Sequence, residues 1–81
     1  MEKLYTFTDY EDAYYTENIS NCKQIGCYLL SHLKSNDQKK TDNLLHQLSN
    51  LKWNWDDSLE KQIEVNQLLQ EIKIWLMVWD N

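Results

Sequence analysis

The chain contains a single glycine and no proline among its 81 residues. Tight hairpins and sharp corners depend on these two residues, so β-sandwiches, barrels and glycine-rich phosphate loops fit this chain poorly. Its length supports one hydrophobic core rather than two. With 42% hydrophobic and 12% aromatic residues, the chain is too apolar to stay disordered. The sequence therefore predicts a single all-α domain spanning residues 1–81.

The spacing of apolar residues predicts a small bundle of three principal helices. The first opens at Thr8, which has capping-box spacing to Glu11. Its apolar face follows a spacing of three and four residues and comprises Tyr15, Ile19, Cys22, Ile25, Leu29 and Leu33. The polar run from Asn18 to Asn21 allows either one continuous helix or two helices with a break near residues 17–21. Residues 4–7 before this helix read as a short extended N-terminal arm.

The second helix is predicted from about Asp37 to about Trp53, after a polar joint that is rich in capping residues. Its inward side comprises Thr41, Leu44, Leu45, Leu48 and Leu51, with Trp55 as a candidate continuation. The third helix is predicted from Asp57, as the cap, to about Trp79. Its core face comprises Val65, Leu68, Leu69, Ile72, Trp75, Leu76 and Trp79. The β-branched and aromatic residues 72–79 leave a strand paired with the N-terminal arm as the alternative, but the unbroken helical spacing favours a helix.

The third predicted helix is apolar on more than one side. Leu59, Ile63, Ile74 and Val78 lie outside its core arc, on a flank that also carries an acidic and polar stripe of Asp57, Glu60, Glu64, Gln67 and Glu71. Exposed apolar clusters of this kind usually mark an interface. We therefore expect either a homodimer or a target-binding surface there.

The charge balance argues against several classes of partner. Thirteen acidic residues face eight basic ones, all of them Lys, for a formal charge of −5. Direct nucleic-acid binding is not expected, because it needs a positive face. No membrane segment is expected either, since the longest apolar run, Ile74–Trp79, has six residues and a span needs about 20. The N-terminus turns acidic where a signal peptide would turn apolar, so we expect a cytoplasmic protein, in the host cell if phage-encoded.

No pattern in the chain predicts catalysis. Cys22, Cys27, His32 and His46 are residue types that bind zinc, but their spacing does not match paired ligands on turns. A nucleophile would need a neighbouring base and an oxyanion hole, and no glycine-flanked nucleophile is present. We expect no enzyme activity and no cofactor.

Two regions combine carboxylates with apolar or aromatic groups and are the candidate partner contacts. One comprises Tyr10, Glu11, Asp12, Tyr14 and Tyr15, and the other comprises Glu60, Ile63, Glu64, Glu71 and Ile74. Tyrosine is enriched at interfaces, and carboxylates beside it suit a basic partner surface. We therefore expect a non-catalytic binding protein that occludes a basic surface on another protein. The alternative is a structural or adaptor subunit that uses its apolar helix face for assembly.

The overall profile is similar to that of small acidic inhibitors encoded by mobile elements. These include toxin immunity proteins, antitoxins and phage anti-defence proteins such as anti-CRISPRs. The resemblance is one of composition and transfers no site residues. Separately, the acidic stripes resemble a surrogate for a phosphate backbone, so we expect the partner to be an enzyme acting on nucleic acid.

Overall fold

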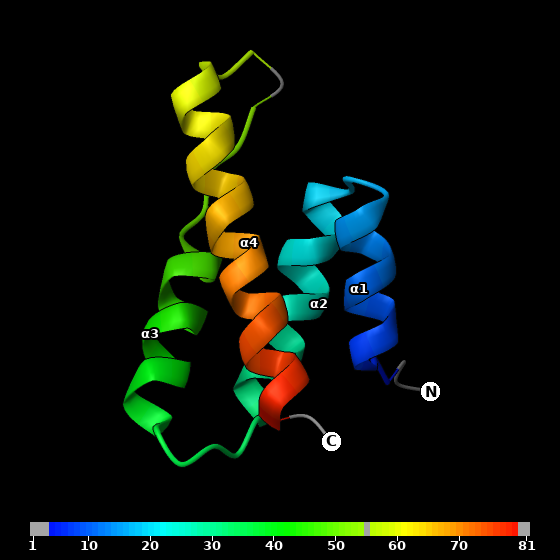
Figure 1. The fold of residues 1–81 in the computed structure, drawn as a ribbon, viewed down its shortest axis with the longest axis vertical. Helices are drawn as coiled ribbons and strands as arrows, with labels where there is room; N and C mark the ends of the chain where they lie inside the picture. Colours follow the sequence, from blue (N-terminus) through cyan, green and yellow to red (C-terminus); the bar gives the residue numbers. More distant parts are fainter. Residues whose placement is uncertain (1–3, 55, 80–81) are drawn as a thin grey trace.

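The computed structural model describes residues 4–54 and 56–79, and this part of the chain is helical with no strand. Four helices follow one another: α1 (Phe7–Tyr15), α2 (Ile19–His32), α3 (Gln38–Ser49) and α4 (Leu59–Trp79). They run alternately up and down as a bundle (Figure 1). The all-α prediction is confirmed. The strand alternative for residues 72–79 is wrong, because α4 continues as a helix through Trp79.

The predicted first helix is two helices, α1 and α2, which is the alternative with a break near residues 17–21, so the count of three principal helices is corrected to four. The break falls at Thr16, Glu17 and Asn18, where Glu17 has a positive φ of 58°. The amide of Asn18 donates to the carbonyl of Ala13 at 3.0 Å, and that of Glu17 donates to Tyr14 at 3.2 Å. This pair of bonds is a Schellman motif, which closes α1. The Asn18 side chain then accepts from the amide of Asn21 at 3.1 Å and caps α2.

The predicted start of α1 at Thr8 is also corrected. Thr6 is the cap, because its hydroxyl accepts from the amide of Asp9 while the Asp9 carboxylate accepts from the amide of Thr6 at 2.8 Å. Thr6–Asp9 has the same capping-box spacing as Thr8–Glu11, so local sequence does not separate the two. The earlier start shortens the described arm to residues 4–6, and Tyr10 of this helix is fully buried.

The two later helices differ from their predicted bounds by a few residues. α3 ends at Ser49 rather than near Trp53, because the side chain of Asn50 donates to the carbonyl of His46 at 3.0 Å and the last turn closes there. α4 begins at Leu59 rather than Asp57, and the hydroxyl of Ser58 accepts from the amide of Lys61 at 3.3 Å. The Asp57 carboxylate instead accepts from the amide of Asn54 at 2.9 Å. Trp55 lies outside the described residues.

The core lies between the four helices and is almost entirely apolar. Its fully buried side chains are Tyr10, Cys22, Leu30, Thr41, Leu44, Leu48, Leu69, Ile72 and Leu76. The predicted core face of α4 is confirmed: Val65, Leu69, Ile72 and Leu76 are buried, while Leu68, Trp75 and Trp79 pack against the core. The indole of Trp75 donates to the hydroxyl of Thr41 at 2.8 Å and thereby joins α4 to α3.

Gly26 of α2 lies where neighbouring helices approach it closely. A Cβ at this position would lie 2.6 Å from Cδ2 of Leu48 and 3.0 Å from Cε2 of Tyr10. Both of these side chains are fully buried, so neither moves aside easily. The lone glycine therefore serves the packing of α1, α2 and α3 around one point.

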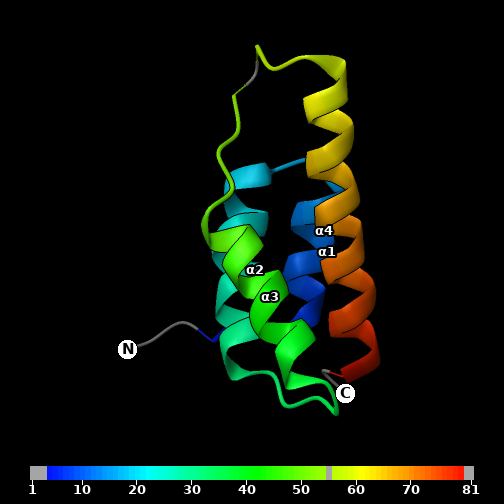
Figure 2. The ribbon, with the colours of Figure 1, turned by 90° about the vertical axis from the view of Figure 1, so that its left-hand side faces the viewer.

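Tyr15, predicted on the buried face of the first helix, is 65% exposed. The break after Tyr15 resets the helical register, so α1 buries Tyr10 and Ala13 instead. The helix α4 is long enough that its N-terminal turns extend past the α1–α2 turn (Figures 1 and 2). None of the helices in the described part of the chain is long and apolar enough to cross a membrane.

Replacing Tyr10 by Phe tests the buried contact between α1 and α4. The phenol of Tyr10 donates to the carbonyl of Leu69 at 2.7 Å, and its loss leaves the ring in place. We expect Tyr10→Phe to lower the free energy of unfolding by about 1 kcal/mol in urea denaturation. Tyr15→Phe, which alters an exposed tyrosine of the same helix, should change it by about 0.5 kcal/mol or less. Equal effects of the two variants would contradict a special role for Tyr10.

Candidate functional site

The outward side of α4 carries five exposed apolar side chains, which we call the outer face: Leu59, Ile63, Ile74, Met77 and Val78. Their exposed fractions run from 48% to 71%. At about 100° per residue, Ile63 and Ile74 point within about 20° of each other. The opposite side of the helix supplies the core. α4 is therefore apolar on two sides, and the described chain covers only one of them.

Three exposed glutamates, Glu60, Glu64 and Glu71, follow one side of the outer face, and we call them the acidic edge. The Oε1 of Glu71 lies 3.8 Å from the Nζ of Lys40. The same Nζ lies 4.7 Å from the centroid of the Trp75 ring. Within the described part of the chain, Glu60 and Glu64 form no salt bridge. These two carboxylates are one helical turn apart and repel each other mildly. Glu64 also lines a hollow that contains Lys52 and Lys61, so among the described residues the acidic edge presents one ion-paired carboxylate and two that form no salt bridge.

Lys73 borders the other side of the outer face and joins it to α1. Its Nζ donates to the hydroxyl of Tyr15 at 2.8 Å and lies 5.4 Å and 4.8 Å from the ring centroids of Tyr14 and Tyr15. The hydrogen bond with Tyr15, helped by the nearby Glu11, raises the pKa of Lys73 above its usual value. We call Glu11, Tyr14 and Tyr15 the tyrosine edge.

The structure brings together eight of the ten residues predicted to contact a partner, on and beside the outer face: Glu11, Tyr14, Tyr15, Glu60, Ile63, Glu64, Glu71 and Ile74. It separates the other two from them. Tyr10 is fully buried, and burial raises the pKa of its phenol well above the usual range. Asp12 lines a groove with Asp9 and Asn21 between α1 and α2.

Sequence reasoning missed Lys73 and Met77. Met77 lies three residues after Ile74 and fourteen after Ile63, so helical spacing alone places it on the outer face. Lys73 had no comparable signal, because its contact with Tyr15 joins residues 58 positions apart.

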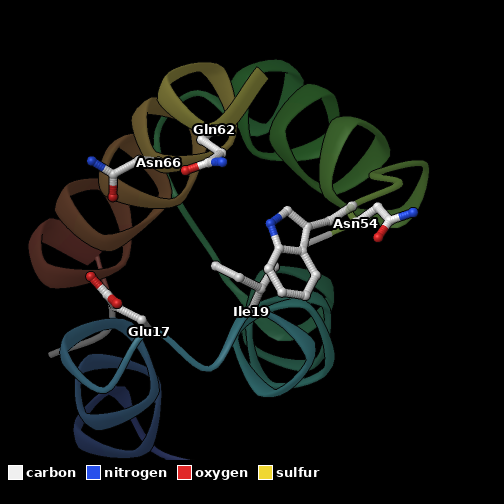
Figure 3. Close-up of a pocket in the computed structure, with 6 residues that line it drawn as sticks. Glu17, Ile19, Asn54, Gln62 and Asn66 are labelled. Atoms are coloured by element: carbon white, nitrogen blue, oxygen red, sulfur yellow. The ribbon is translucent and has the colours of Figure 1, made fainter. Parts of the chain in front are cut away.

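Sequence reasoning also missed a hollow at the end of the bundle, which we call the end pocket. It has a volume of about 230 Å³ and is lined by Glu17, Ile19, Trp53, Asn54, Gln62 and Asn66. Figure 3 shows Glu17 and Ile19 across an opening from Gln62 and Asn66. Its lining comes from the α1–α2 turn, from the segment after α3 and from the N-terminal turns of α4.

The candidate chemical groups identified in the sequence do not converge. In the described chain, no three His, Cys, Asp or Glu side chains are grouped so that they could hold a metal ion. Cys22 is fully buried, and burial raises its pKa to about 11, so its thiol stays protonated at neutral pH. Cys27 is half-buried, with its sulfur 3.8 Å from the hydroxyl of Ser49.

Comparison with protein-family models, curated proteins and solved structures finds no match to this chain.

Replacing Glu17 by Gly tests whether the end pocket contains a strained residue. Glu17 occupies the left-handed C′ position of the Schellman motif, which usually holds Gly. We expect Glu17→Gly to raise the free energy of unfolding by about 1 kcal/mol, because Gly adopts this conformation without a Cβ clash. Glu17→Ala keeps the Cβ and should change stability by about 0.5 kcal/mol or less. A Gly variant no more stable than the Ala variant in urea denaturation would refute strain at Glu17.

Proposed function

We propose that this chain is a non-catalytic binding protein that occludes a basic surface of another protein through the outer face of α4. The observation that carries the proposal is the combination of exposed Ile63 and Ile74 with Glu60 and Glu64 beside them. A purely solvated charged surface does not need isoleucine in its midst. A purely structural surface does not need unpaired carboxylates along its edge.

The proposed partner is an enzyme that acts on nucleic acid. Such enzymes carry positive surfaces that attract a phosphate backbone, and a row of carboxylates on a rigid helix imitates that charge. The formal charge of −5 would speed the encounter with such a surface. Apolar contacts at the outer face would then hold the complex together, and the tyrosine edge would extend the contact onto α1.

Reversing two charges of the acidic edge tests the proposal. The partner is first isolated by pull-down from host extract and mass spectrometry, and its affinity is then measured with purified proteins. We expect Glu60→Lys/Glu64→Lys to weaken binding by tenfold or more, which corresponds to about 1.4 kcal/mol. The difference from the original chain should shrink as the salt concentration rises, because these carboxylates are exposed. Glu60 lies in the first turn of α4, so the variant should lose about 1 kcal/mol of stability at most.

The matched control reverses Asp42 and Asp56, which are exposed on α3 and on the segment before α4. The Asp42→Lys/Asp56→Lys variant has the same net charge as the test variant but leaves the acidic edge unchanged. We expect it to bind within about threefold of the original chain, because only long-range attraction is reduced. An equal loss in both variants, or full affinity of the Glu60→Lys/Glu64→Lys variant, would contradict binding through α4.

The second candidate function is a structural or adaptor subunit that assembles through the same apolar residues. The observation that favours it is the continuous exposure of Ile74, Met77 and Val78 near the end of α4. Apolar surface of this kind drives self-association when no other partner covers it.

Light scattering distinguishes the two candidates. Self-assembly predicts a mass of twice the 9.8 kDa of one chain at tens of micromolar protein, with little dependence on salt. Ile63→Glu/Ile74→Glu should then restore the single-chain mass, because it places carboxylates in the apolar contact. A single-chain mass for the original protein at all salt concentrations would contradict self-assembly.

A further inference from the structure

The end pocket has a chemical character distinct from the outer face. Among the described residues that line the pocket, Glu17 is the charged one. Three side-chain amides are added by Asn54, Gln62 and Asn66. Ile19 and the half-buried indole of Trp53 form its apolar part. The carboxylate and the amide oxygens accept hydrogen bonds, and the indole ring offers a π face. Such a lining suits a cation that is both planar and rich in N–H donors.

A lysine near this lining, Lys23, is already engaged in a hydrogen bond. Lys23 lines an adjoining hollow with Ile19 and Trp53, and its Nζ donates to the carbonyl of Leu51 at 3.0 Å. Glu17 forms no salt bridge within the described chain. The carboxylate in the end pocket is therefore left for a cation from outside.

The volume of the pocket limits what it can hold. Sites for drug-sized ligands occupy about 300 to 1,000 Å³. The end pocket, at about 230 Å³, is below that range and suits the end of one side chain. A phosphate-bearing ligand is disfavoured because the described residues of the lining include a carboxylate and no cation.

The pocket adjoins the proposed contact surface. Gln62 follows Leu59 of the outer face by three residues, and Asn66 follows Ile63 by three, so both lie beside the outer face on the same helix. A protein that covers the outer face would therefore have its own side chains within reach of the pocket.

We propose that the end pocket receives an arginine side chain of the partner protein. The planar guanidinium would stack on the indole of Trp53, direct two N–H groups at the carboxylate of Glu17 and offer the others to the amide oxygens. Arginine fits better than lysine because a lysine ammonium is a compact charge without a planar face. This inference rests on the proposed function, since it names the group by which a basic partner is recognised.

The probe for this proposal is N-acetyl-arginine amide, titrated into the ¹⁵N-labelled full chain and followed by NMR. The side-chain amide signals of Asn54, Gln62 and Asn66 and the indole signal of Trp53 report directly on the pocket. We expect saturable shifts at these signals, with a Kd on the order of millimolar for so small a ligand. N-acetyl-citrulline amide, which has nearly the same shape but no charge, should bind at least about threefold more weakly.

Two variants change the charge of the pocket in opposite directions. Glu17→Gln should weaken the arginine probe about threefold, the effect of removing one exposed ion pair. Asn66→Asp adds a second carboxylate and should strengthen binding about threefold, a gain that misfolding cannot produce. Asp42→Asn removes an exposed carboxylate of α3 outside the pocket lining and should leave the Kd unchanged.

Three results would each overturn the proposal: no saturable shift at the pocket signals, equal affinity for the arginine and citrulline probes, or equal affinity for N-acetyl-lysine amide. The probe is tested on the isolated chain, whereas the acidic edge is tested with the captured partner. Failure of the pocket therefore leaves binding through α4 open, and failure of the acidic edge does not affect the titration.

Discussion

The burial of Tyr10 determines how the other helices approach one another. Its phenol donates to the carbonyl of Leu69 in the middle of α4, and its ring lies against Gly26 of α2. Leu48 of α3 closes on the same glycine, so all four helices meet around this position. A buried hydroxyl must find an acceptor, and the Leu69 carbonyl supplies it at a fixed point along α4. This hydrogen bond sets the position of α1 along the axis of α4.

The position of α1 along α4 accounts for the geometry of two surfaces, the end pocket and the outer face with its tyrosine edge. With 21 residues, α4 is longer than each of the other helices, whose lengths range from 9 to 14 residues. Its N-terminal turns therefore extend beyond the α1–α2 turn, and the end pocket forms beneath them (Figures 1 and 3). Docking of α1 beside α4 also brings Tyr15 to Lys73, which places the tyrosine edge next to the outer face. One packing interaction thus supports the geometry of both candidate contacts.

The spacing of apolar residues predicted part of this arrangement from the sequence. The core face of α4 followed from spacing alone, and the same spacing identified Ile63 and Ile74 as residues outside that face. The residue that caps α1 was harder to predict, because Thr6–Asp9 and Thr8–Glu11 both have capping-box spacing. That spacing does not decide between the two, and in the structure Thr6 is the cap. Tyr15 was predicted on the buried face because one helical register was followed from residue 15 to residue 33. The break at Glu17 changes the register between α1 and α2.

The sequence by itself determined that this chain is helical, that α4 has two apolar sides, and that one of them is bordered by glutamates. Spacing within one helix fixes these features, because neighbouring turns have a constant geometry. Only the tertiary structure decided that Tyr10 is core rather than contact, that Lys73 joins α1 to α4, and that Glu17 and Asn66 face a common pocket. These relations join residues that are far apart in the sequence. Their distances depend on how closely the helices pack, which periodicity does not encode.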